Sequence, residues 1–464
     1  MIGVILLHPP FLQVQRVDPV SGAVYCMLYT VSDLVWRSLV LGAAGGQRVR
    51  PRRLSMDDVW GGNSLCLDGS RVIDRRIYLE EEIFEAEQKR IFAKTWQWVA
   101  HESELPEFGD YVTATIAGSP IVVARGDDDA LNAFYNTCTH RGALVAAHPK
   151  GNCKGSFVCL YHGWCFDTEG KLAAVPLEEA YGDNLPKSRY DIPKIRLETF
   201  FGNIFVCLDD SAPPLVEFLG ATAPYIQAFS EGHEVLGRVR WELEGNWKLW
   251  HENFRDNYHP MFAHAILGIG YQGVKILGEN HDLSDGHSVM LFPLQTKPEN
   301  IAPVVRKLTG RDIEAGEPPN IRQTSTSPPG ADRLHTIMAV FPNLDFQFMS
   351  GGLTGGVLQT VRPVSLNKAI VEIVAYAPKG ESEEAREARL GEILGTQTAA
   401  GKVSGDDNEA ARRCSEGFGT IDAVRWSNMD RGQAPGSTGL KNDEYSLRSF
   451  YVAYKQYMGD VLHG

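Results

Sequence analysis

The chain has 464 residues, of which 43% are hydrophobic and 22% are charged. This composition is that of a globular protein of two or three domains and excludes a disordered or fibrous chain. Asp and Glu outnumber Lys and Arg by 58 to 45, which gives a formal net charge of −13. No basic stripe offsets this balance, so we expect no nucleic-acid partner, because phosphate backbones are bound mainly by Lys and Arg.

The first 55 residues differ in pattern from the rest of the chain. They contain apolar stretches, but early prolines, Asp33 and Arg37 interrupt the run of about 20 apolar residues that a membrane span needs. A basic stretch, GGQRVRPRR, ends at Arg53. We therefore expect residues 1–55 to be a poorly ordered extension, with no membrane anchor and no function of its own.

The next part of the chain changes from a helical to a strand pattern. Apolar side chains recur at roughly helical spacing between Tyr78 and Trp96, which predicts a helical segment within residues 56–96 that belongs to the body of the C-terminal domain. Short alternating runs such as Tyr111–Ile116 then follow, separated by turn residues. They predict a small all-β domain over residues 97–210.

The second half of the chain mixes helices and strands. Helices are expected over Asn246–Phe262, Glu381–Leu394 and Ser446–Tyr457. Strands are expected at Thr336–Phe341, Phe346–Met349, Val357–Val361 and Ile370–Ala377. An antiparallel sheet framed by helices is the arrangement that this order favours, so we expect an α+β domain over residues 211–464.

Cysteine and histidine are crowded in two short segments of the predicted all-β domain. Cys138 and His140 lie in the sequence CTHRG, and Cys159 and His162 lie in CLYHGW. A zinc finger usually keeps its cysteines in one half and its histidines in the other. Here each segment supplies one cysteine and one histidine. This arrangement suits a two-iron cluster in which one iron takes two cysteines and the other takes two histidines. A structural zinc site with two cysteines and two histidines is the alternative.

The two segments resemble the ligand loops of the Rieske [2Fe–2S] domains of aromatic ring-hydroxylating oxygenases. The shared positions extend beyond the ligands to Arg141, Gly142, Gly163 and Trp164. The resemblance implies that Cys138, His140, Cys159 and His162 bind a [2Fe–2S] cluster.

Rieske proteins of respiratory complexes resemble these loops as well, but they carry an extra disulfide between them. Ala143 and Tyr161 occupy the places of those two cysteines. A cluster without this bridge is expected at the low end of the Rieske range, with a midpoint potential below zero millivolts.

A second group of candidate ligands lies in NWKLWHENFRDNYHPMFAH, residues 246–264. Here Asp256, His259 and His264 follow the spacing D-x2-H-x4-H. Two imidazoles and one carboxylate form the facial triad of non-haem Fe(II) oxygenases. Histidines five residues apart do not share a helix face, but Pro260 directly after His259 is expected to distort the helix and let both imidazoles converge.

The resemblance also implies roles for the acidic and amide residues around this second site. The third ligand is expected downstream in VSGDDNEA, where we choose Asp407 over Asp406; capping of a helix N-terminus is the alternative for this acidic pair. Asp256 is then not a ligand but a catalytic bridge between His259 and a Rieske histidine of a neighbouring subunit. Asn253 is expected close to the iron.

The resemblance covers about residues 70–460 and implies the α (large, catalytic) subunit of a terminal oxygenase. Such a cytoplasmic protein takes electrons from NAD(P)H through a reductase, with or without a ferredoxin, and uses O2 to dihydroxylate an aromatic ring. One Rieske cluster and one mononuclear Fe(II) are implied, in a homotrimer with or without a β subunit. The alternatives are a Rieske monooxygenase that demethylates or hydroxylates once, and a Rieske electron carrier without catalytic iron.

The substrate is indicated only by the C-terminal segment. The run GLKNDEYSLRSFYVAYKQYMG resembles the tail of oxygenases that act on aromatic carboxylates. Lys441 or Arg448 would then pair with the substrate carboxylate, and Phe348 would contact the ring. Solvated surface charges and ordinary core packing are the alternatives for these residues.

Overall fold

The computed structural model describes residues 2–6, 11–17, 24–30, 71–182, 185–264, 279–293, 334–349, 356–432 and 443–463. The chain divides into two compact units, residues 1–61 and 62–464. The first unit contains an antiparallel sheet in the order β1 (Ile2–Leu6), β2 (Phe11–Val17) and β3 (Val24–Thr30). The predicted boundaries at residues 55, 96 and 210 stay predictions. Among the described helices, none is long and apolar enough to cross a membrane.

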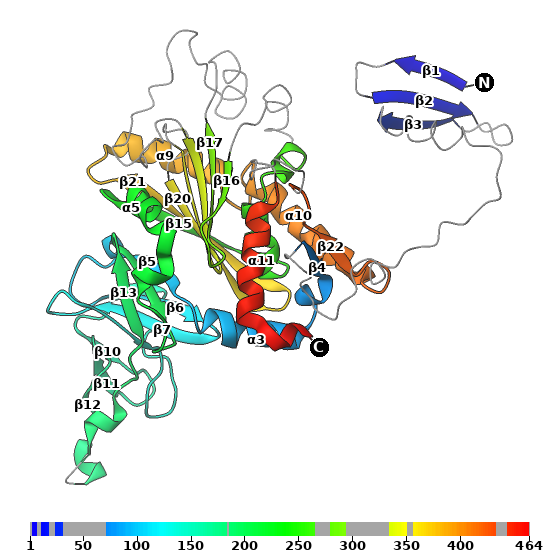
Figure 1. Ribbon diagram of the computed structural model, residues 1–464. Helices are drawn as coiled ribbons and strands as arrows, with labels where there is room; N and C mark the ends of the chain where they lie inside the picture. Colours follow the sequence, from blue (N-terminus) through cyan, green and yellow to red (C-terminus); the bar gives the residue numbers. More distant parts are fainter. Residues whose placement is uncertain are drawn as a thin grey trace. The chain divides into compact units, whose positions relative to one another are not determined.

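The first half of the larger unit is built from short antiparallel strands, as predicted (Figure 1). They form sheets in the orders β8-β7-β6-β9, β13-β14-β5 and β10-β11-β12. β7 is buried on both faces, because alternate residues contribute to two different hydrophobic clusters. The bounds are β5 (Gln97–His101), β6 (Asp110–Ile116), β7 (Ser119–Arg125), β8 (Leu131–Tyr135), β9 (Lys150–Asn152), β10 (Ser156–Val158), β11 (Cys165–Asp167), β12 (Leu172–Ala174), β13 (Arg196–Phe200) and β14 (Asn203–Cys207).

The second half contains a seven-stranded antiparallel sheet in the order β15-β21-β20-β19-β18-β17-β16. This arrangement confirms the predicted α+β class and the four predicted strands, which are β18 to β21, and it adds β15, β16 and β17, for which no strands were predicted. The bounds are β15 (His233–Glu244), β16 (Glu279–Asp282), β17 (Ser288–Pro293), β18 (Leu334–Val340), β19 (Leu344–Met349), β20 (Gly356–Ser365) and β21 (Lys368–Pro378). A separate short pair joins β4 (Val72–Asp74) to β22 (Trp426–Asn428).

Helices cover both faces of this sheet. One face packs against α4 (Leu215–Leu219) and α5 (Ala223–Ser230) through a continuous apolar cluster. The other packs against α6 (Trp247–Arg255), α10 (Ser404–Gly417) and α11 (Tyr445–Met458), of which α11 is the red helix of Figure 1. Two further helices in the described part of the chain are α3 (Glu81–Glu87), which continues as a π-turn to Phe92, and α9 (Glu383–Thr396).

Helix α6 is shorter than predicted. It begins where the Asn246 side chain accepts a hydrogen bond from the Lys248 N–H at 3.2 Å, and it ends at Arg255 instead of Phe262. The backbone of Asp256 is extended, and its carboxylate accepts from the Tyr258 N–H at 2.6 Å. This local hydrogen bond competes with continuation of the helix. The break therefore comes before Pro260, which lies inside a separate short turn.

A buried polar network joins α6 to α3 and α11. Glu252 accepts hydrogen bonds from the hydroxyls of Tyr78, at 2.7 Å, and Tyr451. The two hydroxyls lie 2.9 Å apart. One helical turn earlier, the Lys248 ammonium donates to the buried carboxylate of Glu87 at 2.6 Å. The network fixes the start of the segment that carries the residues of the second predicted site.

We expect the stability of the protein to fall with rising pH because of Glu252. Burial raises the pKa of this carboxyl to about 7, against about 4.3 in an unfolded chain. Between these values the folded state keeps a proton that the unfolded state has released, so its stability declines through this window and stays lower above it. Glu252→Gln is expected to remove this decline, on the order of 2–4 kcal/mol. The free energy of unfolding by urea at pH 5 and at pH 8 measures this decline. Glu416→Gln, on the exposed face of α10, is the control and should keep the decline.

Candidate metal centres

The two cysteine- and histidine-containing segments fold into loops with the same backbone pattern. In each loop the N–H of a glycine donates to the cysteine carbonyl, at 2.8 Å between Gly142 and Cys138 and at 2.9 Å between Gly163 and Cys159. The cysteine N–H in turn donates to the carbonyl of the residue after the glycine. Both glycines have positive φ, +80° and +72°, which other residues adopt only with strain. The glycines therefore turn each loop so that its cysteine and histidine face the other loop.

The four candidate ligands pair by type across the two loops. Cys138 and Cys159 are both buried and belong to the same hydrophobic cluster. The rings of His140 and His162 lie 4.5 Å apart between centroids. His140 is also stacked on the indole of Trp164, with ring centroids 4.8 Å apart and planes at 6°. The cysteines thus form a buried pair and the histidines a pair nearer the surface.

This pairing fits a Rieske cluster, in which two cysteines hold one iron and two histidines hold the other. Nδ1 of His140 is buried and has no hydrogen-bond partner, as expected of an atom that serves as a ligand. Burial, together with the neighbouring His162 and Arg141, lowers the pKa of His140 and favours the neutral imidazole that binds metals. Burial and the adjacent Cys159 raise the pKa of Cys138, and a bound iron would hold both sulfurs as thiolates.

The two loop glycines give a matched pair of variants. At Gly142 an added Cβ meets nothing within 4 Å, whereas at Gly163 it would lie 2.9 Å from Cγ of Pro176. Both alanine variants carry the strain of a positive φ, about 1 kcal/mol, but only Gly163→Ala adds a steric clash. We expect Gly163→Ala to lower the cluster content several-fold and Gly142→Ala to lower it only slightly. Visible absorbance and the iron content of the purified variants test this, and equal losses would contradict it.

The second predicted site comes together from two distant segments. His259, His264 and Asp407 each offer a ligand atom, and these atoms all lie within 4.8 Å of one another. Oδ1 of Asp407 lies 3.4 Å from Nε2 of His259 and 3.3 Å from Nε2 of His264. Ligands at right angles around an ion, with bonds of about 2.1 Å, lie about 3 Å apart. The donor set and its spacing therefore fit the facial triad predicted for a mononuclear iron.

Neighbouring side chains orient two of these three residues. Asn253 donates from Nδ2 to Oδ1 of Asp407 at 3.1 Å, and Oδ2 of Asp406 lies 3.4 Å from Nδ1 of His264. A carboxylate at Nδ1 selects the tautomer whose Nε2 lone pair faces the ion. The N-cap residue of α10 is Val403, with no side-chain cap, so the acidic pair lies inside the first turn and the capping alternative fails.

Asp256 lies beside the triad without joining it. Its Oδ2 is 3.8 Å from Nδ1 of His259, beyond hydrogen-bond distance, and that nitrogen is buried without a hydrogen-bond partner. Burial raises the pKa of Asp256, and the nearby His259 opposes the shift. The position is compatible with a carboxylate that accepts from His259 after a small adjustment. Its role as a bridge between subunits stays a prediction.

The structure describes two of the three substrate residues predicted from the sequence, Phe348 and Arg448. Arg448 is buried in α11 and donates to two backbone carbonyls, at 2.9 and 2.7 Å. Phe348 packs on the apolar face of the sheet, 5.7 Å from the ring of Phe229. Lys441 lies outside the described residues. Their substrate roles stay predictions.

Some residues that shape these sites have no recognisable sequence signal. The buried amide of Asn136 accepts from the N–H groups of Val145 and Ala146 and so fixes the first cluster loop. His251, which is extra to the D-x2-H-x4-H pattern, is buried in the core with Nδ1 at 3.1 Å from Oδ2 of Asp345. Single polar residues of this kind show their partners only in the folded structure.

Comparison with known proteins agrees with this geometry. Residues 95–195 match the model of the Rieske [2Fe-2S] domain, and residues 231–460 match that of the ring hydroxylating alpha subunit (catalytic domain). The chain is 30% identical over 396 residues to 2-aminobenzenesulfonate 2,3-dioxygenase subunit alpha of Alcaligenes sp., covering 83% of this chain and 93% of that protein. It is 31% identical over 421 residues to the large oxygenase component of the naphthalene 1,2-dioxygenase system of Pseudomonas putida, covering 82% and 90%.

Solved structures show the same relationship. Naphthalene 1,2-dioxygenase with indole bound in its active site superposes with a TM-score of 0.69 at 27% identity, covering 86% of this chain and 95% of that one. A quaternary ammonium Rieske monooxygenase shares the fold, with a TM-score of 0.66 at 20% identity, covering 83% and 94%. The matched domains account for a Rieske cluster and a catalytic non-haem iron. The chain therefore belongs to the Rieske aromatic ring-hydroxylating dioxygenases, as the α subunit of an oxidoreductase that carries both iron centres.

Proposed function

We propose that this chain is a terminal oxygenase that adds both atoms of O2 to an aromatic ring. One O2, two electrons and two protons are consumed for each dihydrodiol formed, and NAD(P)H supplies the electrons through a separate reductase, with or without a ferredoxin. The observation that carries the proposal is the convergence of His259, His264 and Asp407 in a chain that also has the two Rieske loops. When bound, the cluster supplies single electrons, and the mononuclear iron offers open coordination positions to O2.

The residues of the chain then have distinct tasks at the mononuclear site. Asn253 holds the Asp407 carboxylate through its 3.1 Å hydrogen bond, and Asp406 holds the ring of His264. Asp256 accepts from Nδ1 of His259 and, across a subunit interface of a homotrimer, from His162 of the neighbouring subunit. The exposure of His162 supports this arrangement, because such a contact needs an accessible ring. The proposal does not require a β subunit.

The proposed substrates are aromatic acids. Two relatives have names that specify an aromatic ring with an anionic group, 2-aminobenzenesulfonate 2,3-dioxygenase and the anthranilate 1,2-dioxygenase of Burkholderia cepacia. A cation in an apolar pocket selects such an anion strongly. We place the enzyme in the cytoplasm, where thiols stay reduced, since none of the six described cysteines forms a disulfide.

Turnover of a panel of aromatic acids and hydrocarbons, with a reconstituted reductase and 18O2, tests this function. The proposal expects a product that carries both labelled oxygen atoms, and fastest turnover of an acid. A product with a single labelled atom would show that the chain is a monooxygenase and not a dioxygenase. The monooxygenase alternative uses the same two metal centres. A preference for neutral hydrocarbons would show that aromatic acids are not the substrates, and it would leave the proposed oxygenase function intact.

A further inference from the structure

A buried amide without a hydrogen-bond partner lies in the middle of the seven-stranded sheet. Gln359 is on β20 and its side chain is 0% exposed. Neither its Oε1 nor its Nε2 has a hydrogen-bond partner in the described part of the chain. Buried polar side chains are nearly always hydrogen-bonded, to protein, to ordered water or to a ligand. The amide can therefore offer an acceptor and a donor to a bound molecule at the same time.

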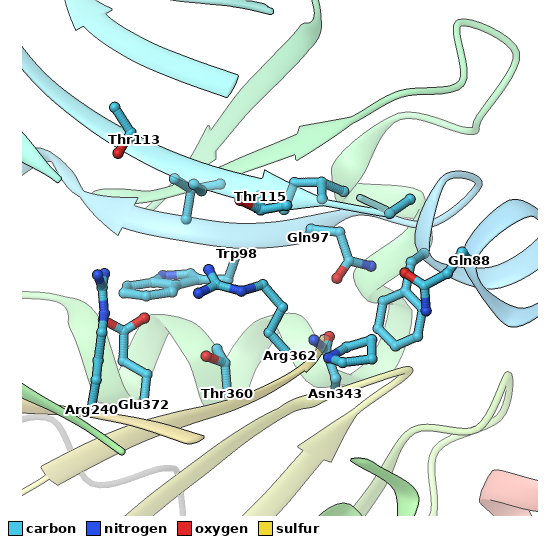
Figure 2. A pocket seen from close by; sticks show the side chains of 16 residues that line it. Gln88, Gln97, Trp98, Thr113, Thr115, Arg240, Asn343, Thr360, Arg362 and Glu372 are labelled. Carbon is cyan, nitrogen blue, oxygen red and sulfur yellow. The ribbon is translucent and has the colours of Figure 1, made fainter. Parts of the chain in front are cut away.

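The amide points to the face of the sheet that packs against α6. Figure 2 shows the opposite face, from which Thr360 and Arg362 point toward β5 and β6. Successive side chains of a strand alternate between faces, so Gln359 points away from β5 and β6. Its neighbours on the same face of β20, Val357 and Val361, belong to the apolar clusters that also contain residues of α9 and α6. The amide is thus surrounded by the apolar layer between the sheet and these helices.

Helix α6 crosses the sheet above this layer. Trp250 packs against Trp241 of β15, with ring centroids 5.5 Å apart. One turn later, Phe254 packs against Met290 of β17 and Ile337 of β18. Since β15 and β17 lie on either side of β21, β20, β19 and β18, the helix passes over the middle of the sheet between these contacts.

Gln359 lies below the midpoint of this path. Trp241 is level with Val361 of β20, through the pairing of both strands with β21. Ile337 is level with Val357 of β20, through the pairing of both strands with β19. Gln359 comes between these two positions of β20 and on the same face, so it lies halfway along the line from Trp241 to Ile337.

The mononuclear site is joined to both ends of the same line. Asp407 accepts a hydrogen bond at 3.1 Å from Asn253, the residue before Phe254 on α6. Asn408, the residue after Asp407, accepts from Nε1 of Trp241 at 3.0 Å. A molecule bound between the iron site and the sheet therefore lies above the buried amide.

We infer that Gln359 orients the substrate, and that the substrate is an aromatic acid with a hydrogen-bond donor beside its acidic group. Nε2 donates to the carboxylate, and Oε1 accepts from an amino or hydroxyl group in the ortho position. An acid without this donor leaves the amide oxygen unpaired, and a site built to form a hydrogen bond discriminates strongly against a molecule that cannot form it. The substrate class named here rests on the proposed function.

The binding of two acids to the full-length metal-loaded protein tests this role. By titration calorimetry, the unmodified protein is expected to bind 2-aminobenzoate about 10-fold more tightly than benzoate, or better. Gln359→Leu should weaken the binding of 2-aminobenzoate and bind both acids about equally. Gln97→Leu is the matched control, because Gln97 is a buried amide on the far side of the sheet that already donates to Thr95 at 2.8 Å (Figure 2). It should keep the preference of the unmodified protein.

A crystal structure of the unmodified protein with 2-aminobenzoate gives a second test that needs no variant. The carboxylate is expected at hydrogen-bond distance from Nε2 of Gln359, and the amino group at hydrogen-bond distance from Oε1. An amide that donates instead to Oδ1 of Asp345, directly opposite on β19, would overturn the inference. This structure decides the question if Gln359→Leu does not fold.

The binding data can contradict the role of Gln359 as well. No binding of either acid, equal affinity of the unmodified protein for both, or an unchanged preference in Gln359→Leu would each overturn it. Failure of the proposed oxygenase function gives a different result, which is an acid that binds with the expected preference and yields no product with two labelled oxygen atoms.

Discussion

His264→Ala is expected to leave about two iron atoms per chain in place of about three and to abolish turnover. The imidazole is buried, and its Nε2 lies 3.3 Å from Asp407, so its loss leaves a carboxylate and one imidazole for the ion. The four ligands of the cluster lie on other loops and are untouched. Metal analysis and substrate-dependent O2 uptake measure the two losses, while the EPR spectrum of the reduced cluster should be unchanged.

A matched histidine variant separates this effect from a general loss of folding. His148→Ala removes an exposed imidazole in the Rieske half and should keep both the iron content and the activity. If His264→Ala keeps about three irons per chain, the triad assignment is wrong. If it loses the Rieske spectrum as well, the variant is misfolded and Asp407→Ala takes its place in the same comparison.

Asp256→Asn is expected to keep both metal centres and yet lower turnover by at least 100-fold. The carboxylate is not one of the three converging ligands, so iron content should stay at about three per chain. Its Oδ2 lies 3.8 Å from Nδ1 of His259, where an anionic acceptor can orient the imidazole and accept a second imidazole N–H from a neighbouring subunit. An amide of the same shape lacks the charge and one acceptor.

Single-turnover kinetics locate the defect. With the cluster reduced in advance, Asp256→Asn should oxidise its cluster far more slowly than the unmodified protein when O2 and substrate are added. Asp422→Asn, which changes an exposed aspartate, is the control and should behave as the unmodified protein. Full activity of Asp256→Asn would contradict the proposed role of Asp256 as a bridge between subunits.

Local sequence patterns predicted much of this architecture. The alternating strands of the Rieske half and the strands β18 to β21 appear where periodicity indicated them. β15 escaped prediction, since it alternates charged residues such as Arg238 and Arg240 at an edge of the sheet, where burial is incomplete on both faces. The end of α6 was misplaced because a hydrogen bond of Asp256, not Pro260, stops the helix first.

At the metal centres, too, local sequence patterns predicted some of the residues and missed others. Cys138 and His140, or His259 and His264, are close in sequence, so their spacing alone indicates a ligand pair. Asp407 lies on α10, far from the histidines in sequence, and no local pattern distinguishes it from Asp406; the choice came from family resemblance. The contacts that orient the ligands, such as Asn253 with Asp407, depend on tertiary packing and became visible only in the structure.

The central claim is that one polypeptide carries a Rieske cluster and a separate mononuclear iron. Iron and acid-labile sulfide, measured together on the protein reconstituted with Fe(II) and sulfide, test it most directly. The account predicts about three irons and about two sulfides per chain, with a Rieske-type EPR signal after reduction. About two irons with two sulfides would mean that the chain is an electron carrier without a catalytic iron. Bound zinc without sulfide would contradict both iron centres.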